Sequence, residues 1–191
     1  YALSERISTV ARTLTIGSHH IGDDSKCYVI AEIGHNHQGK LQTCMDLFKA
    51  AKEAGVSAVK LQKRNTRGMY TKALYDKPYE NENSYGATYG AHREALEFGL
   101  SEYRTLQQYC RELGVDFFAT AFDFDSADFL ASIDMPAYKI ASGDLKNIPL
   151  LEHVAGFGEP IIISTGGAEL DDVKRAYYAV MAINKQVCLL Q

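Results

Sequence analysis

The chain is 191 residues long, with 46% hydrophobic and 23% charged residues and a formal net charge of −4 at pH 7. This balance is typical of a globular protein and disfavours intrinsic disorder, collagen and coiled coil. The acidic balance argues against non-specific nucleic-acid binding, and no apolar run reaches the ~18 residues that a membrane helix needs.

Residues 1–27 are expected to form an irregular N-terminal arm, in which the apolar run at 13–17 fits a short strand. This region contains no apolar core of a secretory signal. The four cysteines form no Cys-x-x-Cys pair. They therefore indicate neither a zinc site nor a disulfide framework, and a reducing, cytoplasmic location is expected.

From residue 28 onward, short apolar runs alternate with segments of helical periodicity. Strands are predicted at 28–34, 57–62, 116–122, 137–142, 160–165 and 187–191. Helices are predicted between them at 41–55, 100–114, 125–133, 149–158 and 169–183, the second of them capped by Ser101. This alternation predicts a parallel sheet, and the nearly continuous apolar character of its strands indicates that both faces are covered.

Six parallel strands fit either an open doubly wound sheet or a large part of a (β/α)8 barrel. The first alternative predicts a GxGxxG loop after the first strand, whereas residues 34–39 read GHNHQG. The second predicts polar side chains where several strands end, and the sequence has them. We therefore expect an α/β fold, a (β/α)8 TIM barrel of which residues 28–191 supply about the first six βα units. Because six parallel strands do not close a barrel at the usual shear, the rest is expected beyond Gln191 or from a partner.

Two lysines lie at equivalent places inside apolar strands, Lys60 in AVKLQ and Lys139 in AYKIAS. A buried ammonium is costly unless it is paired, so we interpret the two as converging on an anion at the barrel mouth. The alternative is that each lysine extends past its strand end or pairs with a carboxylate. Thr120, Ser142 and Ser164 add hydroxyls at strand ends, which fit a phosphate and carboxylate cradle but are also common in ordinary turns.

Three other features leave their roles open. Glu32, near the end of the first strand, fits a counter-ion of the lysines, a general acid/base or a hydroxyl-binding group. His35 and His37 need a third ligand to hold a metal, so hydrogen-bonded or solvated histidines are favoured. The long tyrosine-rich segment 63–100 fits a functional lid or a packed loop excursion on the barrel rim.

Five motifs together resemble the sialic acid synthase family. They are AEIGHNHQG (31–39), AVKLQ (58–62), SYGATYGAHREALEF (84–98), YKIASGD (138–144) and IISTGG (162–167). The resemblance covers about residues 10–191, and the third motif is closest to members that make N-acetylneuraminate or its 9-phosphate. It implies a TIM barrel followed by a small antifreeze-like domain in a domain-swapped homodimer. It also implies condensation of phosphoenolpyruvate with N-acetylmannosamine or a related 2-acetamido sugar, with phosphate release.

The resemblance also implies roles for individual residues. Those expected to hold the phosphate and carboxylate of phosphoenolpyruvate are Lys60, Thr120, Lys139, Ser142 and Ser164. Gln62 is expected to contact the sugar, and Glu32 to act beside the reacting carbons as a catalytic or sugar-binding group. Asn36 and His37 are expected to bind substrate with them. The divalent metal, usually Mn²⁺, is expected to be held by two histidines beyond position 191, so no metal ligand, His35 included, is expected in this chain.

Three alternatives remain, and the third of them belongs to a different functional class. One is a phosphoenolpyruvate-dependent synthase that uses another aldose phosphate, such as arabinose 5-phosphate. The second is a class I aldolase with a Schiff base on Lys60 or Lys139. The third is a non-catalytic binding protein derived from a barrel.

Overall fold

A single curled sheet of parallel strands organises the protein. The structure, a computed structural model, describes residues 12–191. The sheet has six strands in the order β3-β4-β5-β6-β7-β8, so each strand pairs with its neighbours in the sequence. They are β3 (Ile30–Gly34), β4 (Ala58–Lys63), β5 (Asp116–Ala121), β6 (Tyr138–Ile140), β7 (Ile161–Ser164) and β8 (Val187–Leu190). This open half-barrel confirms the predicted fold class, the first six βα units of a TIM barrel.

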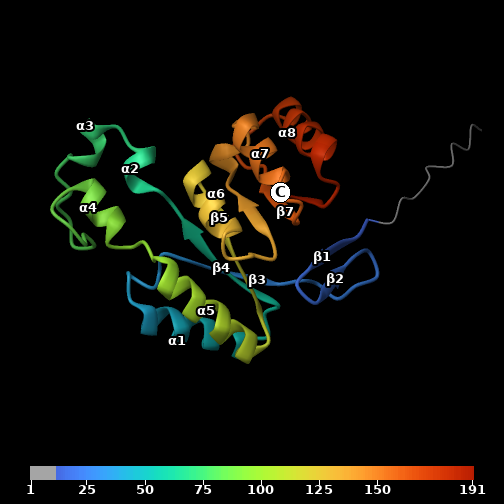
Figure 1. The fold of residues 1–191 in the computed structure, drawn as a ribbon, viewed down its shortest axis with the longest axis horizontal. Helices are drawn as coiled ribbons and strands as arrows, with labels where there is room; N and C mark the ends of the chain where they lie inside the picture. The colour runs from blue at the N-terminus through green and yellow to red at the C-terminus, as the bar shows by residue number, and fades with distance from the viewer. Residues whose placement is uncertain (1–11) are drawn as a thin grey trace, which may run out of the picture.

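Helices connect successive strands and cover the sheet. They are α1 (Leu41–Glu53), α5 (Leu100–Leu113), α6 (Phe124–Ala131), α7 (Ile148–Ala155) and α8 (Leu170–Ile183). Consecutive helices lie side by side around the sheet: α1 next to α5, α6 next to α7, and α7 next to α8 (Figure 1). Apolar side chains that recur at helical spacing, such as Phe48 and Leu106, are fully buried against the strands. Burial of one such side chain stabilises the fold by about 1.5–3 kcal/mol.

A small hairpin precedes the half-barrel. Its strands are β1 (Leu14–Ile16) and β2 (His19–Ile21), which pair antiparallel. His19 Nδ1 lies 2.7 Å from Asp116 Oδ2, and the Tyr28 hydroxyl donates to the same oxygen over 2.7 Å. Since Asp116 begins β5, the hairpin lies at the amino ends of the strands. The first of these strands is predicted by the apolar run at 13–17, whereas the second is not predicted from the sequence. Residues 1–11 of the predicted arm lie outside the described residues.

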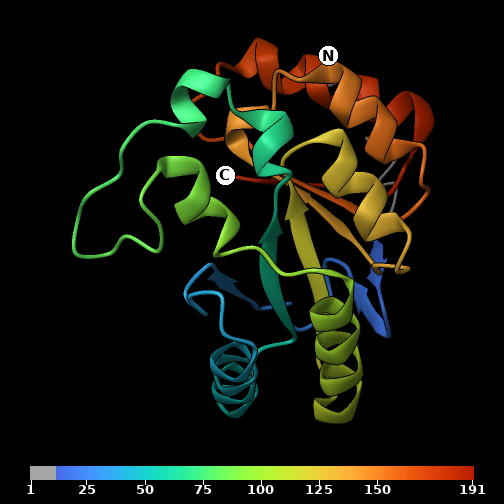
Figure 2. The ribbon, with the colours of Figure 1, turned by 60° about the vertical axis from the view of Figure 1, so that its left-hand side comes forward.

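The β4–α5 connection, residues 64–99, contains three short helices. These are α2 (Thr66–Met69), α3 (Lys72–Tyr75) and α4 (Tyr89–Glu94). The connection stands away from the sheet at the end where β4 finishes (Figure 2). The predicted Ser101 cap of α5 is wrong: the helix is capped at Gly99, whose N–H donates to the Glu102 carboxylate over 3.1 Å.

Two further observations concern membrane-spanning helices and the cysteines. None of the helices within residues 12–191 is long and apolar enough to cross a membrane. Cys27, Cys44, Cys110 and Cys188 are free thiols.

Candidate active site

A cavity of about 370 Å³ lies on the inner side of the sheet, where the strands end. Seven of the nine site residues predicted from the sequence line it: Glu32, Lys60, Gln62, Thr120, Lys139, Ser142 and Ser164. Its apolar wall includes Phe122 and Leu190, which the sequence analysis did not identify. Residues from β3 to β8 thus meet in one place, as the strand-end rule for barrels predicts.

Lys60 lies at the centre of this cavity because of the strand register. It is directly opposite Glu32 of β3, and its side chain forms an ion pair with the Glu32 carboxylate. Only 5% of Lys60 is exposed, and its ammonium also donates to Thr120 Oγ1 over 2.6 Å. Burial lowers the pKa of Lys60, while the Glu32 carboxylate acts in the opposite direction. Glu32 is therefore a counter-ion of Lys60. Because its side chain is also about half exposed, the same position leaves room for a role as a reactive carboxylate.

Lys139 is the second cation of the cavity. It lies opposite Thr120 in the register of β5 and β6, one strand further along than Lys60. Its ammonium donates to the Ile140 carbonyl over 2.6 Å. Burial, together with the nearby Lys60 ammonium, lowers the pKa of Lys139 to about 8, with Glu32 opposing this effect. Both cations line the cavity, and Glu32 is the only carboxylate among its lining residues, so the site favours a small anion.

A break in the strand register fixes the edge of the cavity. Glu32 pairs with Lys60 and Gly34 with Leu61, so β3 carries one extra residue at Ile33. Such bulges redirect side chains and are frequent beside active sites. Gly34 has a φ of +56°, and a Cβ there would lie 3.4 Å from Glu32 Oε1 and 3.6 Å from Gln62 Nε2. The glycine therefore lets the backbone approach both side chains.

The serines come from two neighbouring loops. Ser142 begins the 3₁₀ turn η1 (Ser142–Asp144) after β6, and Ser164 ends β7. A Cβ on Gly166 would lie 3.8 Å from Ser142 Oγ, so the loop after β7 packs against this serine. Both serines and Lys139 therefore line the cavity from the neighbouring strands β6 and β7 and the turn after β6.

The structure does not bring Asn36 and His37 into the cavity wall. The Asn36 side chain donates to the Ile33 carbonyl over 2.9 Å. His37 is 1% exposed, stacks on Phe98 with ring centroids 4.1 Å apart, and accepts from the Gly39 N–H over 3.1 Å. Burial and the neighbouring His35 lower the pKa of His37 to about 4, so it is neutral near pH 7. Both residues hold the loop that follows Glu32 in shape.

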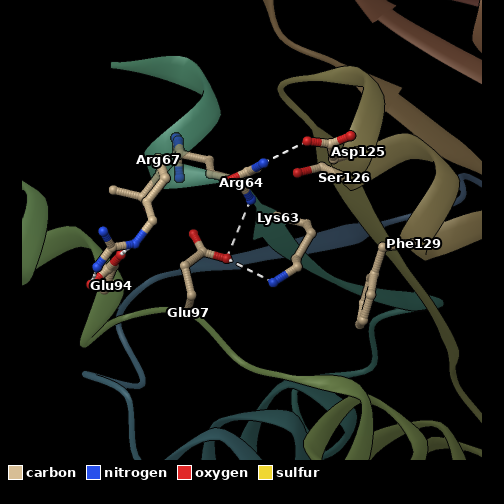
Figure 3. Close-up of a pocket in the computed structure, with 10 residues that line it drawn as sticks. Lys63, Arg64, Arg67, Glu94, Glu97, Asp125, Ser126 and Phe129 are labelled. Carbon is tan, nitrogen blue, oxygen red and sulfur yellow. Dashed lines mark hydrogen bonds and ion pairs between the residues drawn. The ribbon is translucent and has the colours of Figure 1, made fainter. Parts of the chain in front are cut away.

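A charged network beside the cavity was not predicted. Glu97 accepts from the Lys63 ammonium over 3.3 Å and from the Arg64 backbone N–H over 3.2 Å (Figure 3), and its other oxygen lies 3.3 Å from His35 Nε2. These bonds lower the pKa of Glu97, although burial alone would raise it. The network joins the loop after β3, the end of β4 and the start of α5. Pairings across such sequence distances leave no periodic signal in the sequence.

The described residues do not form a metal site. Among residues 12–191, no group of three or more His, Cys, Asp or Glu side chains is placed to hold an ion. His35 contacts Glu97 and the Arg64 guanidinium, and His37 packs on Phe98.

Comparisons with known proteins agree with this geometry. A model of the NeuB family matches residues 47–191. The chain is 38% identical over 171 residues to the N-acetylneuraminate-9-phosphate synthase of Homo sapiens, an alignment that covers 90% of this chain and 48% of that protein. It is 41% identical over 159 residues to the Drosophila melanogaster protein of the same name, covering 83% and 43%.

A solved structure gives the same picture. The chain matches an N-acetylneuraminic acid (sialic acid) synthetase from Leptospira borgpetersenii serovar Hardjo-bovis with a TM-score of 0.79 and 28% identity, covering 94% of this chain and 58% of that one. The chain spans about half the length of the curated relatives it matches.

Proposed function

Because this chain belongs to the NeuB family, we propose that the complete protein is a phosphoenolpyruvate-dependent synthase. It condenses phosphoenolpyruvate with N-acetylmannosamine, a related 2-acetamido sugar or its 6-phosphate, giving a sialic acid-type nonulosonate and phosphate. The observation that carries the proposal is the convergence of two buried ammonium groups, those of Lys60 and Lys139, on one cavity. A small, highly charged substrate such as phosphoenolpyruvate offsets the cost of holding these cations together.

The reaction sets the tasks of the cavity. C3 of phosphoenolpyruvate forms a bond to the aldehyde carbon of the open-chain sugar, whose oxygen gains a proton. Positive charge develops at C2, and water adds there with loss of a proton. The bond between C2 and the bridging oxygen of the phosphate then breaks, the new C2 hydroxyl gives up its proton to become the ketone, and phosphate leaves. Lys60 and Lys139 hold the phosphate and carboxylate, and the hydroxyls of Thr120, Ser142 and Ser164 donate to them. Their contribution is positioning and electrostatic stabilisation by groups that the fold already holds in place.

We assign Glu32 and Gln62 to the sugar side of the cavity. The Glu32 side chain is about half exposed even though it pairs with Lys60, so one part of the carboxylate remains accessible. That position suits a catalytic carboxylate that exchanges a proton with the sugar or binds its hydroxyls. Asn36 and His37 bond within the loop after Glu32, and their contact with substrate stays a prediction.

Other parts of the proposal concern the complete protein. The described residues do not fit the divalent metal, Mn²⁺, that the family resemblance implies, and its ligands are expected beyond Gln191. We propose a homodimer that acts in the cytoplasm and does not bind nucleic acid or membranes.

The test is phosphate release by the full-length protein with phosphoenolpyruvate and Mn²⁺. N-acetylmannosamine, its 6-phosphate and arabinose 5-phosphate are the acceptors in parallel assays. We expect release with an N-acetylmannosamine acceptor, and loss of release in Lys60→Ala and Lys139→Ala. Lys72→Ala is the matched control, because Lys72 is exposed in the β4–α5 connection and pairs with Asp76.

Each alternative has its own outcome in this design. Release with arabinose 5-phosphate alone would assign the protein to a different synthase. No release with any acceptor would contradict the proposal. Labelling by pyruvate and borohydride, lost in Lys60→Ala or Lys139→Ala, would indicate a class I aldolase.

A further inference from the structure

Two arginines near the cavity, Arg64 and Arg93, form no ion pair with a carboxylate among the described residues, and neither lines the cavity itself. Arg64 follows β4 directly, and Arg93 belongs to α4. Among the described residues, the ion pairs within 4 Å involve Arg12, Arg67 and Arg175 but neither Arg64 nor Arg93. Both side chains are half-buried. An arginine cannot lose its charge in a protein, so unpaired guanidinium groups at such a place indicate an anionic ligand.

Arg64 lines a neighbouring pocket (Figure 3), and its contacts place it beside the substrate cavity. Its guanidinium stacks on the Phe122 ring, with the central carbon 3.7 Å from the ring centroid. Phe122 follows β5 and lines the cavity that contains Lys60 and Lys139. On another side, Arg64 NH1 lies 3.4 Å from His35 Nδ1, in the loop after β3. Arg64 is therefore held among loops that follow three adjacent strands, one aromatic ring away from the cavity.

Arg93 faces the same region from the β4–α5 connection. Its Nε and NH2 donate to the Tyr89 hydroxyl over 3.1 and 2.9 Å. Since the hydroxyl accepts from Arg93, its own proton is free to donate to a ligand. The Tyr89 ring packs edge-on against Tyr70, with centroids 5.2 Å apart. Burial and the positive charge of Arg93 lower the pKa of Arg64, so the two guanidinium groups share one electrostatic neighbourhood.

The neighbouring carboxylates are already occupied. Glu94 pairs with Arg67 at 2.8 Å, and Glu97 is shared among Lys63, His35 and the backbone of Arg64 (Figure 3). Glu97 is the carboxylate that partly offsets the charge of Arg64, and its Oε2 already accepts from Lys63 and from the Arg64 backbone N–H. The positive charge of Arg64 and Arg93 is therefore available to a ligand.

We propose that Arg64 and Arg93, with the Tyr89 hydroxyl, form a subsite for a phosphate group on the acceptor sugar. The inference rests on the proposed function, because it concerns the second substrate of that reaction. Lys60 and Lys139 are occupied by phosphoenolpyruvate, so a second phosphate needs its own cations. Two guanidinium groups match a dianion in charge and in their directed N–H donors. The acceptor is then a phosphorylated 2-acetamido sugar, with its phosphate at the rim and its aldehyde inside the cavity.

The test compares N-acetylmannosamine with its 6-phosphate in the full-length protein. We expect kcat/KM to be at least about tenfold higher for the phosphorylated sugar, and this ratio to fall about tenfold or more in Arg64→Gln and in Arg93→Gln. Arg64→Lys should recover part of the ratio. Arg67→Gln is the control, because Arg67 lies three residues away, is exposed and is paired with Glu94. A ratio that is unchanged in Arg64→Gln and Arg93→Gln would overturn the subsite and leave the synthase intact.

A binding measurement separates this inference from the proposed function. Calorimetric titration of N-acetylmannosamine 6-phosphate without phosphoenolpyruvate should show binding that weakens in Arg64→Gln but not in Arg67→Gln. If the protein binds the sugar phosphate in this way but releases no phosphate with any acceptor, the synthase proposal fails and the subsite stands. No binding in the wild type and no turnover with the phosphorylated sugar would overturn the subsite.

Discussion

The Lys60 ammonium donates to Thr120 Oγ1 over 2.6 Å, which joins β4 to β5 inside the cavity. A hydroxyl has one proton to donate and two lone pairs that accept. Because Lys60 uses a lone pair of Thr120, the hydroxyl proton is directed toward another acceptor. The pair can therefore present two donors, one charged and one neutral, to the same substrate oxygens.

This relationship predicts a large effect of one Thr120 variant on KM and a small effect of another. Thr120→Val removes the hydroxyl but keeps the shape, and we expect the KM for phosphoenolpyruvate to rise about tenfold, or ~1.4 kcal/mol. Thr120→Ser keeps the hydroxyl and should change KM less than about threefold. Steady-state phosphate release measures both. A rise in KM for Thr120→Ser as large as that for Thr120→Val would contradict a specific role of the hydroxyl.

The pKa of about 8 at Lys139 predicts a pH dependence of binding. Below pH 8 the side chain is a cation and attracts the anionic substrate; above it the cation is lost. The dissociation constant of phosphoenolpyruvate should therefore be flat below about pH 8 and rise above it. Lys139→Arg should remove the rise, because arginine stays charged. Calorimetric titrations between pH 6.5 and 9.5, run in two buffers to count protons taken up, test this point.

The same pKa predicts how Lys139 affects stability. Its folded value lies below the ordinary 10.5, so between about pH 8 and 10.5 the unfolded state binds more protons and stability rises with pH. Below about pH 8 the full cost of burying the cation is present. Lys139→Met should stabilise the protein at pH 7 by on the order of 1 kcal/mol while abolishing turnover, and the gain should shrink toward pH 10. A destabilised Lys139→Met at pH 7 would show that the lysine contributes to the fold.

The lowered pKa of Glu97 predicts a second effect of pH on stability, in this case a loss at low pH. Its pKa is lowered from 4.5, so its stabilising contribution is present above pH 4.5 and is lost as the pH falls through the folded value. Glu97→Gln should destabilise the protein by about 2 kcal/mol at pH 7, and by less at pH 4, since it removes the carboxylate charge to which Lys63 and the Arg64 N–H donate. Denaturant titrations at the two pH values measure the difference. Glu94→Gln is the control, because an exposed pair contributes about 0–1 kcal/mol.

The loop after β3 packs tightly against the end of α4 at Gly39, so a side chain at this position should destabilise the protein. Its φ is +71°, and a Cβ would lie 2.1 Å from the Ala95 carbonyl oxygen. Gly55 also has a positive φ, +86°, but a Cβ there would have no neighbour within 4 Å. Gly55→Ala should therefore cost only the backbone term, about 1–2 kcal/mol, and Gly39→Ala a further 1–3 kcal/mol, roughly. Similar losses in thermal unfolding of the two variants would argue against tight packing at Gly39.

The sequence predicted the sheet and cavity well, because both depend on local patterns. Apolar runs alternating with helical periodicity define the six strands, and polar residues at strand ends such as Lys60 and Ser164 converge as a parallel sheet requires. The cap of α5 was missed because Glu102 binds the Gly99 backbone without a Ser or Thr at the cap. The short helices of the β4–α5 connection were missed because each is too short to show a periodicity.

The site residues that were missed depend on tertiary contacts. Arg64 reads in the sequence as one polar residue of a loop, and its importance follows only from the Phe122 ring and His35 beside it. Conversely, Asn36 and His37 belong to a recognisable motif, yet their side chains bind their own loop and Phe98. A motif identifies residues that belong together, but it does not show which of their side chains line the cavity.

The hairpin at the amino ends of the strands has a consequence for folding kinetics. The contact between His19 and Asp116 closes a span of 97 residues, so it is entropically favourable only after β3, β4 and β5 have assembled. A contact that forms late contributes little to the folding rate and mainly slows unfolding. The hairpin therefore mainly slows unfolding. Weakening its contact, as in Asp116→Asn, should shorten the lifetime of the native state, although this end of the barrel is remote from the reacting groups.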